Sequence, residues 1–206
     1  MGRDKAFIKI DAVPLWQRQL RVLSQLAPSE IFIAGPPHPE WENTGCTILA
    51  DARAECGPLG GIVAALRHLS SELLLALAVD LPEMSADYLR RLMGHSAGGR
   101  GVIPWRTCYE PLAAVYPKRS LRVAERLLDA REYSLQSFAD VCVREELAVK
   151  QPVSPTDAPR FFNMNTPADI AAVAAEASRK GRKGSQRGSG SCAKPLRPLR
   201  EAFFAK

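Results

Sequence analysis

The stretch Leu73-Leu74-Leu75-Ala76-Leu77-Ala78-Val79-Asp80-Leu81-Pro82 decides the fold. Residues 73–79 are apolar without interruption, and a continuous run of this length is typical of a strand that is buried on both faces. Asp80 then places a carboxylate at the end of the strand. In open α/β sheets, ligands bind beyond the carboxyl ends of the strands. The stretch therefore predicts a buried parallel strand with a functional edge.

Similar short apolar runs alternate along the chain with helical patterns. Further strands are expected at residues 30–35, 46–51, 102–104 and 112–116. Apolar residues at helical spacing predict helices at residues 15–26, 60–69, 85–93, 121–128, 135–141 and 167–177. Strands that alternate with helices of about 10–15 residues predict an α/β fold with a Rossmann-like, doubly wound and mostly parallel sheet.

The composition favours a globular protein and argues against a membrane-spanning or secreted one. The 206 residues are 46% hydrophobic and 24% charged, the balance of an ordinary globular protein with one domain. No run of 18 apolar residues is present, so a membrane span is excluded, and the first residues lack the apolar segment of a secretory signal. The five cysteines form no C-x-x-C pair, which favours a reducing compartment. We therefore expect a cytoplasmic protein.

Charge divides the chain into two parts. Residues 1–178 have a net charge of −2, whereas residues 179–206 carry nine Lys/Arg and one acid. Gly, Ser and like charges cannot bury enough apolar surface to offset chain entropy, so we predict a domain at 1–178 and a disordered basic tail at 179–206. Basic residues without interleaved aromatic residues favour a solvated extension over a nucleic-acid interface. Removal of the tail is expected to leave stability and turnover unchanged.

Two carboxylates end predicted strands. Asp80 is well placed to hold Mg²⁺, which takes one or two protein carboxylates together with substrate phosphates; the alternative is an aspartate that caps the next turn. Asp51 precedes the turn Gly57-Pro58-Leu59-Gly60-Gly61, which opens a predicted helix. Backbone amides of such a turn can approach a ligand closely, although a tight connecting turn explains the same residues.

Asn163 and Asn165 stand two residues apart near the start of the last predicted helix. In an extended segment they share a face, where two amides can bind a ligand or read a base edge. The alternative is an Asx turn that caps the helix at Thr166. Taken alone, Lys5 indicates no function and is typical of a solvated chain terminus.

In order along the chain, these pieces resemble the molybdenum cofactor guanylyltransferase family of nucleotidyltransferases. The resemblance covers roughly residues 1–178 and rests on Met1-Gly2-Arg3-Asp4-Lys5, Asp51 with the turn 57–61, Val79-Asp80-Leu81-Pro82, Glu110-Pro111-Leu112-Ala113-Ala114-Val115-Tyr116 and Phe162-Asn163-Met164-Asn165-Thr166-Pro167. Each motif alone is of moderate specificity, whereas the ordered set is specific.

The resemblance implies an enzyme that transfers GMP from GTP to the phosphate of molybdopterin-bound molybdenum and releases pyrophosphate. By resemblance, Lys5 contacts the nucleotide phosphates and Asp80 binds Mg²⁺, so these two are the expected catalytic residues. Asp51 contacts the guanosine end. The turn formed by Gly57, Pro58, Leu59 and Gly60 packs against base or ribose, and Asn163 and Asn165 lie on the molybdopterin side.

The resemblance also implies partners. GTP and the molybdenum cofactor are the expected ligands, and molybdenum-insertion proteins or a chaperone of a molybdoenzyme are candidate protein partners. Neither a membrane nor nucleic acid is expected. Two alternatives remain at this stage: a cytidylyl or sugar-phosphate nucleotidyltransferase, and a non-catalytic protein that binds and hands over the molybdenum cofactor.

One departure from the family concerns its opening strand and the Leu-Ala-Gly-Gly-x-Ser-x-Arg loop, which precede the matched Met1–Lys5 segment. We therefore expect an N-terminally incomplete domain whose activity suffers from the missing phosphate loop. Because the family's first strand is central, residues 31–34 and 73–79 are each expected to lack a neighbouring strand, with unpaired backbone groups beside the core.

Overall fold

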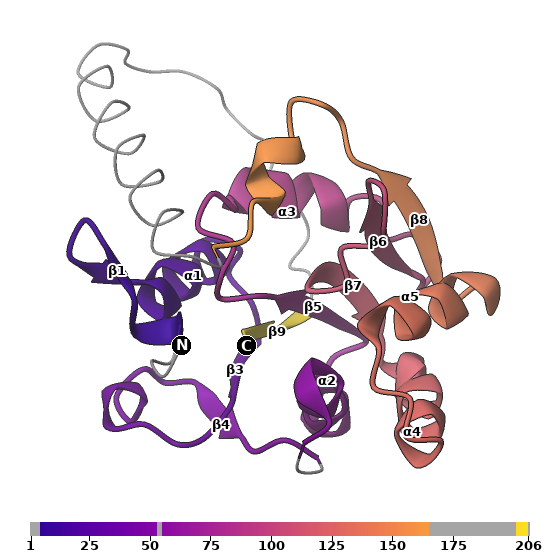
Figure 1. The fold of residues 1–206 in the computed structure, drawn as a ribbon, viewed down its shortest axis with the longest axis horizontal. Helices are drawn as coiled ribbons and strands as arrows, with labels where there is room; N and C mark the ends of the chain where they lie inside the picture. The colour runs from indigo at the N-terminus through magenta and orange to yellow at the C-terminus, as the bar shows by residue number, and fades with distance from the viewer. Residues whose placement is uncertain (1–4, 53–54, 165–200, 206) are drawn as a thin grey trace.

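The computed structural model describes residues 5–52, 55–164 and 201–205. A seven-stranded sheet crosses the molecule, with helices on both faces (Figure 1). Its strands follow the order β4-β3-β9-β5-β7-β6-β8, with bounds β3 Glu30–Ala34, β4 Thr47–Leu49, β5 Leu73–Leu77, β6 Gly101–Trp105, β7 Ala113–Pro117, β8 Ala148–Pro152 and β9 Glu201–Ala205. β7 runs antiparallel to both of its neighbours, and the other pairings are parallel.

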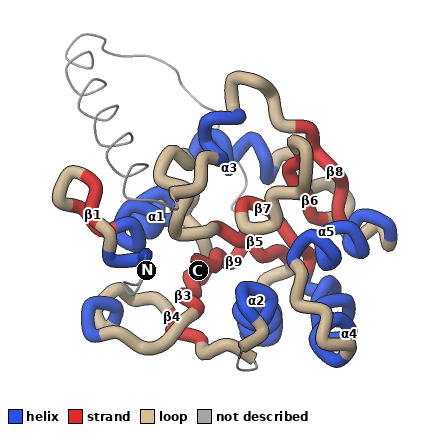
Figure 2. The backbone as a smooth tube through the Cα atoms, viewed as in Figure 1, coloured by secondary structure: helices blue, strands red, loops and turns tan. Residues whose placement is uncertain are grey.

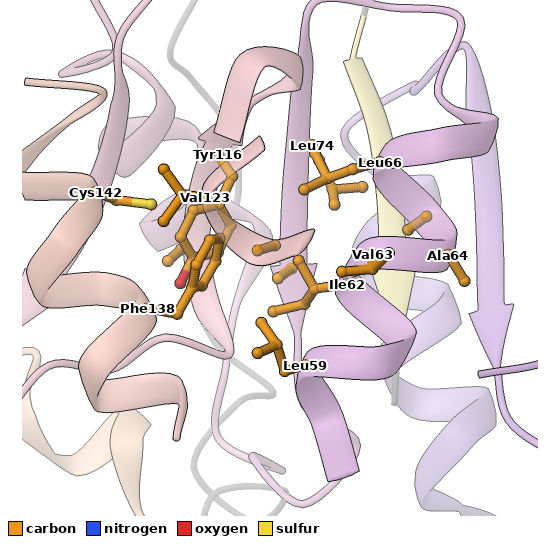
Figure 3. Close-up of a cluster of buried hydrophobic side chains, with 14 of the residues drawn as sticks. Leu59, Ile62, Val63, Ala64, Leu66, Leu74, Tyr116, Val123, Phe138 and Cys142 are labelled. Carbon is orange, nitrogen blue, oxygen red and sulfur yellow. The ribbon is translucent and has the colours of Figure 1, made fainter. Parts of the chain in front are cut away.

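The helices pack in two layers against the sheet (Figure 2). They are α1 Leu15–Ser24, α2 Gly57–His68, α3 Ala86–Met93, α4 Leu121–Asp129 and α5 Leu135–Arg144. One buried cluster joins α2, α4 and α5 to the sheet, as the side chains around Ile62, Tyr116 and Phe138 show (Figure 3). A second cluster joins α1 and α3 to the other face. The structure therefore confirms the predicted doubly wound, mostly parallel sheet.

Local sequence explains how several elements begin. Ser85 caps α3, because its Oγ accepts a hydrogen bond from the Tyr88 backbone N–H at 3.4 Å. Leu74 through Leu77 are completely buried, which accounts for the uninterrupted apolar run of β5. At the start of β6, a Cβ on Gly101 would collide with the Val115 carbonyl, so only glycine fits this close approach.

Some elements differ from the sequence-based expectation. β8 was not expected, because its polar residues alternate with apolar ones at the edge of the sheet. The small hairpin of β1 (Lys9–Ile10) and β2 (Val13–Pro14) was also not expected as a pair of strands. The helix predicted at residues 167–177 lies outside the described residues. None of the helices in the described part of the chain is both long and apolar enough to cross a membrane.

The C-terminal end of the described structure concerns the two strands that were expected to lack a neighbour. Residues 179–200 and 206 of the predicted tail lie outside the described residues, and residues 201–205 pair as β9 in the middle of the sheet. β9 pairs in parallel with β3 on one side and β5 on the other. In the described structure, the two strands expected to lack a neighbour therefore each have one.

Candidate active site

Asp80 lies just beyond the carboxyl end of β5 and is paired with a lysine from the beginning of the chain. Lys5 Nζ donates a hydrogen bond to Asp80 Oδ2 at 3.3 Å. The lysine side chain is 42% exposed and the aspartate side chain 22% exposed, so solvent and ligands can reach the pair. The structure thus brings together the two residues expected to be catalytic, which stand 75 positions apart in the sequence.

The segment that carries Lys5 is anchored to the domain. Lys5 begins the short 3-10 helix η1 (Lys5–Phe7), and its carbonyl accepts a hydrogen bond from the Ile8 N–H at 3.1 Å. The neighbouring Ala6 is buried in a cluster with Ile33 and Trp41. Packing of this helix holds the lysine at the carboxyl edge of the sheet.

The described part of the C-terminal motif, residues 162–164, reaches the same edge from the other end of the domain. The Met164 N–H donates a hydrogen bond to the Asp80 carbonyl at 3.1 Å, and the Met164 side chain is buried. Asn163 is exposed next to this contact. Asn165 lies outside the described residues. The structure therefore places the exposed Asn163 one residue from the backbone contact with Asp80.

Ion pairs fix the approach of this segment. It follows the 3-10 helix η4 (Ala158–Phe161), where Arg160 donates hydrogen bonds to Asp157 at 3.0 Å and to the Ser85 Oγ at 2.8 Å. Arg91 pairs with the same aspartate at 2.9 Å. Burial alone would raise the pKa of Asp157, but the hydrogen bonds from Arg160 and Ser154 and the charge of Arg91 together lower it. The carboxylate remains charged and ties the segment to α3.

Asp51 and the glycine-rich turn lie along the same edge but farther from Asp80. Asp51 follows β4, which is three interstrand spacings from β5, or about 14 Å at about 4.8 Å per spacing. Across the turn, the Ala52 N–H donates to the Gly60 carbonyl at 3.2 Å. Asp51 and Asp80 therefore follow strands that are separated by two other strands at the same edge of the sheet.

The turn residues have different environments. Gly57 starts α2 with a positive φ of 55°, a conformation that favours glycine. Pro58 is half-buried, whereas Leu59 is completely buried in the core. A contact from Leu59 to a nucleotide would have to come from its backbone. The first-turn amides of a helix lack acceptors within the helix, which leaves them suited to an anionic or polar group.

The donor set at Asp80 fits a magnesium ion bound together with substrate. Among the described residues there is no group of three His, Cys, Asp or Glu side chains that could hold a metal by themselves. Mg²⁺ is commonly held by one or two carboxylates plus substrate phosphates and water. A partly exposed aspartate just beyond a strand end matches this mode.

Sequence reasoning missed a group formed by a basic side chain and Phe161, which precedes Asn163 by two residues. Arg106 follows β6, donates to Glu110 at 2.7 Å through Nε, and lies over the Phe161 ring with its guanidinium carbon 5.5 Å from the centroid. Because β6 and β5 point the same way, Arg106 shares the carboxyl edge with Asp80. The signal was available: a charged pair four residues apart directly follows an apolar run.

Sequence reasoning also missed a second group, in which a lysine of β8 contacts two aromatic rings. Lys150 of β8 places its ammonium 3.5 Å from the centroid of the Trp105 ring, and that ring packs edge-on against Tyr109 at 4.8 Å. Tyr109 is further fixed by Gln136, which exchanges hydrogen bonds with its backbone N–H at 3.0 Å and carbonyl at 2.8 Å. Burial, and more weakly Asp140, raise the pKa of Tyr109, so its phenol stays neutral.

Comparison with known proteins matches this architecture. A family model described as a MobA-like NTP transferase domain matches residues 1–146. A probable molybdenum cofactor guanylyltransferase of Opitutus terrae is 32% identical over 82% of this chain and 86% of its own length. A molybdenum cofactor guanylyltransferase of Pseudomonas putida (strain GB-1) is 28% identical over 81% of this chain and 86% of its own length.

Solved structures show the same fold. The molybdopterin-guanine dinucleotide biosynthesis protein A of Archaeoglobus fulgidus is 24% identical, superposes with a TM-score of 0.69, and covers 86% of this chain and 92% of its own. The 2-C-methyl-D-erythritol 4-phosphate cytidylyltransferase of Thermus thermophilus is 16% identical, with a TM-score of 0.66 over 86% of this chain and 95% of its own. At these identities the likeness concerns the α/β nucleotidyltransferase fold alone.

Proposed function

The chain belongs to the MobA-like NTP transferase family, and from this premise we propose that it transfers GMP from GTP to the molybdenum cofactor. It is a homologue of the molybdenum cofactor guanylyltransferases, and hence a nucleotidyltransferase of molybdenum cofactor biosynthesis. A phosphate oxygen of molybdopterin attacks the α-phosphorus of GTP, the bond from that phosphorus to the bridging oxygen breaks, and pyrophosphate leaves. No covalent enzyme intermediate is needed, so the chain's task is positioning and charge neutralisation.

The observation that carries this proposal is the ion pair of Lys5 with Asp80 at the carboxyl end of β5. The lysine ammonium is a partly exposed cation on a flexible stem, suited to triphosphate oxygens. Asp80 would hold Mg²⁺, which supplies charge neutralisation at the phosphates when it is bound. In the absence of ligand the two side chains neutralise each other, so the site keeps both charges ready at the place where phosphates arrive.

Asp51 and the Gly57–Gly60 turn are proposed to receive the guanosine end. β4 and β5 lie about 14 Å apart in the sheet, which gives an extended nucleotide room to lie along this edge with its phosphates at Asp80. The carboxylate of Asp51 accepts hydrogen bonds only, which suits the N–H donors of guanine or the ribose hydroxyls. The half-buried Pro58 is proposed to offer an apolar surface to base or ribose.

Asn163 and Asn165 are proposed to face molybdopterin. The Met164–Asp80 hydrogen bond supports this arrangement, because it holds Asn163 next to the site where the α-phosphorus would react. Arg106, within reach of the same segment through Phe161, is a candidate for the acceptor phosphate. Handover of the product to molybdenum-insertion proteins or a molybdoenzyme chaperone belongs to the same proposal.

The test compares two aspartate variants in a pyrophosphate-release assay with GTP, molybdenum cofactor and Mg²⁺. Asp80→Asn keeps the side-chain volume and removes the charge, and we expect turnover to fall roughly a thousandfold. Asp87→Asn is the matched control, because this aspartate is highly exposed on α3 and pairs with Arg90 of the same helix. Near-normal Mg²⁺-dependent turnover of Asp80→Asn would contradict the proposed site.

A further inference from the structure

One polar side chain interrupts the buried face of α1. Three residues of this helix, each four positions after the last, are buried together: Leu15, Gln19 and Leu23. The two leucines are completely buried, and Gln19 is 1% exposed. Residues four apart share one face of a helix, so the pattern calls for an apolar residue at position 19. The glutamine therefore departs from the pattern of its own helix.

The amide group of Gln19 has one hydrogen bond and one unpaired end. Its Nε2 donates to the Leu81 carbonyl at 2.6 Å, across 62 positions of the sequence. Its Oε1 is buried and has no hydrogen-bond partner among the described residues. A buried acceptor without a partner lowers stability, and an apolar side chain of similar size would avoid this cost. Stability of the fold therefore does not favour glutamine at this position, whereas its contact with Leu81 adjoins the candidate active site.

The Leu81 carbonyl has a partner even without Gln19. The Met84 N–H donates to this oxygen at 3.1 Å and closes the turn that follows Asp80. A carbonyl oxygen has two lone pairs, so it can accept from both groups at once. What Gln19 adds is a link between this turn and α1, which packs with α3 on one face of the sheet (Figure 1).

The backbone around Asp80 is held from three separate parts of the chain. The Ala78 N–H donates at 2.7 Å to a carbonyl just before β7, and the Asp80 carbonyl accepts from the Met164 N–H at 3.1 Å. The Leu81 carbonyl accepts from Gln19. Because each peptide group is planar, these contacts leave the Asp80 Cα little freedom. Of the three, the contact from Gln19 is made by a side chain, so a single substitution can remove it.

We propose that Gln19 is a positioning residue, which acts through Leu81 to hold Asp80 where Mg²⁺ and the triphosphate of GTP meet it. This rests on the function proposed above, because Asp80 is the carboxylate of that site. Without the amide of Gln19, Asp80 keeps its charge but must be ordered when the ligands bind, and this lowers their affinity. Removal of the amide should therefore weaken Mg²⁺-dependent turnover without unfolding the chain.

The first test uses Gln19→Met in the full chain. Methionine keeps the length and the unbranched stem of glutamine, is apolar like its neighbours on α1, and cannot donate a hydrogen bond to Leu81. In the pyrophosphate-release assay, we expect the Mg²⁺ concentration for half-maximal turnover to rise roughly tenfold. The unfolding midpoint should be unchanged or higher, because the unpaired Oε1 is gone. Gln25→Met is the matched control, since Gln25 is exposed at the end of the same helix, and it should leave both values unchanged.

Hydrogen exchange measured by NMR tests the same contact without the reaction. The N–H groups of Met164 and Met84 donate to the two carbonyls that follow the Asp80 Cα. Both amides should exchange roughly tenfold faster in Gln19→Met than in Gln25→Met. Amides of α5, which packs on the opposite face of the sheet, should exchange at the same rate in both variants.

The two measurements separate this proposal from the function on which it rests. Absence of GTP turnover by the unmodified chain would contradict the proposed function, while the exchange rates still decide whether Gln19 holds the Asp80 turn. Unchanged exchange of the Met164 and Met84 amides would overturn the proposal. So would a lower unfolding midpoint with an unchanged Mg²⁺ dependence, because it would show a purely structural role.

Discussion

β5 and β9 lie side by side in the middle of one sheet and run in the same direction, but they are held there differently. β5 connects α2 to the site residue Asp80 and has an antiparallel neighbour, β7, on its other side. β9 comes after a connection of 36 residues, 165–200, and its place is defined by pairing with β3 and β5. The centre of the sheet thus combines a strand fixed by its connections with one fixed by docking.

Removal of β9 is the largest expected perturbation of this arrangement. The chain ending at Arg200 leaves facing backbone groups of β3 and β5 without strand partners beside a core that excludes water. Each buried unsatisfied group costs about 1–3 kcal/mol, so several of them consume much of a total stability of about 5–15 kcal/mol. We expect a large drop in unfolding midpoint or loss of the cooperative transition, measured by circular dichroism. An unchanged midpoint would mean that β9 does not complete the sheet.

Paired substitutions at one register position compare the two strands directly. Leu75 and Phe203 are opposite each other in the sheet. Leu75→Ala should destabilise the chain by about 2–5 kcal/mol, because it leaves a cavity at a completely buried position. If β9 is as integral as β5, Phe203→Ala should cost a similar amount in denaturant unfolding. A cost below about 0.5 kcal/mol for Phe203→Ala would show a strand that pairs weakly or intermittently.

The hydrogen bonds that Glu30 of β3 accepts from Ser70 and Ser71, just before β5, are expected to make a smaller contribution to stability that depends on pH. Burial tends to raise the pKa of Glu30, but hydrogen bonds from Ser70 and Ser71 more than offset this and lower it below the usual 4.5. A carboxyl group with a lowered folded-state pKa stabilises the fold above its unfolded-state pKa, and this contribution is lost as pH falls through the folded-state value. We expect Glu30→Gln to cost about 1 kcal/mol at pH 7.

The cost of Glu30→Gln should then shrink once pH drops below about 4.5, because the native glutamate also becomes neutral. Unfolding curves of both proteins at pH 7, 5 and 3.5 measure this difference. A cost that stays constant across this range would show that the charge of Glu30 does not contribute to the stability supplied by its hydrogen bonds with Ser70 and Ser71.

Much of the fold could be predicted from the sequence because the patterns that indicate its strands and helices lie in adjacent residues. The apolar run of β5 and the strand-end position of Asp80 follow from residues that are adjacent in the sequence. β8 was missed because an edge strand with alternating polar residues lacks such a run. β9 was missed because a basic, glycine-rich segment precedes it, and its strand state depends on a gap formed by residues far away.

The site was predictable to the same extent. Residue patterns placed Asp80 and Asp51 at one edge, because parallel strands share a carboxyl end. The contact of Lys5 with Asp80, the hydrogen bond from Met164 and the position of Arg106 near Phe161 are tertiary facts that no local pattern contains. The roles of Asn163 and the Gly57–Gly60 turn remain predictions.

The central claim is that the edge around Lys5 and Asp80 moves a guanylyl group, and the fate of the α-phosphate tests it most directly. GTP labelled at the α-phosphorus should pass its label to the molybdenum cofactor with one pyrophosphate released per transfer, and Mg²⁺ should be required. α-Labelled CTP, run in parallel, should transfer label far more slowly. Label that stays on GTP in the presence of acceptor and Mg²⁺, or that moves from CTP at the same rate, would contradict the account.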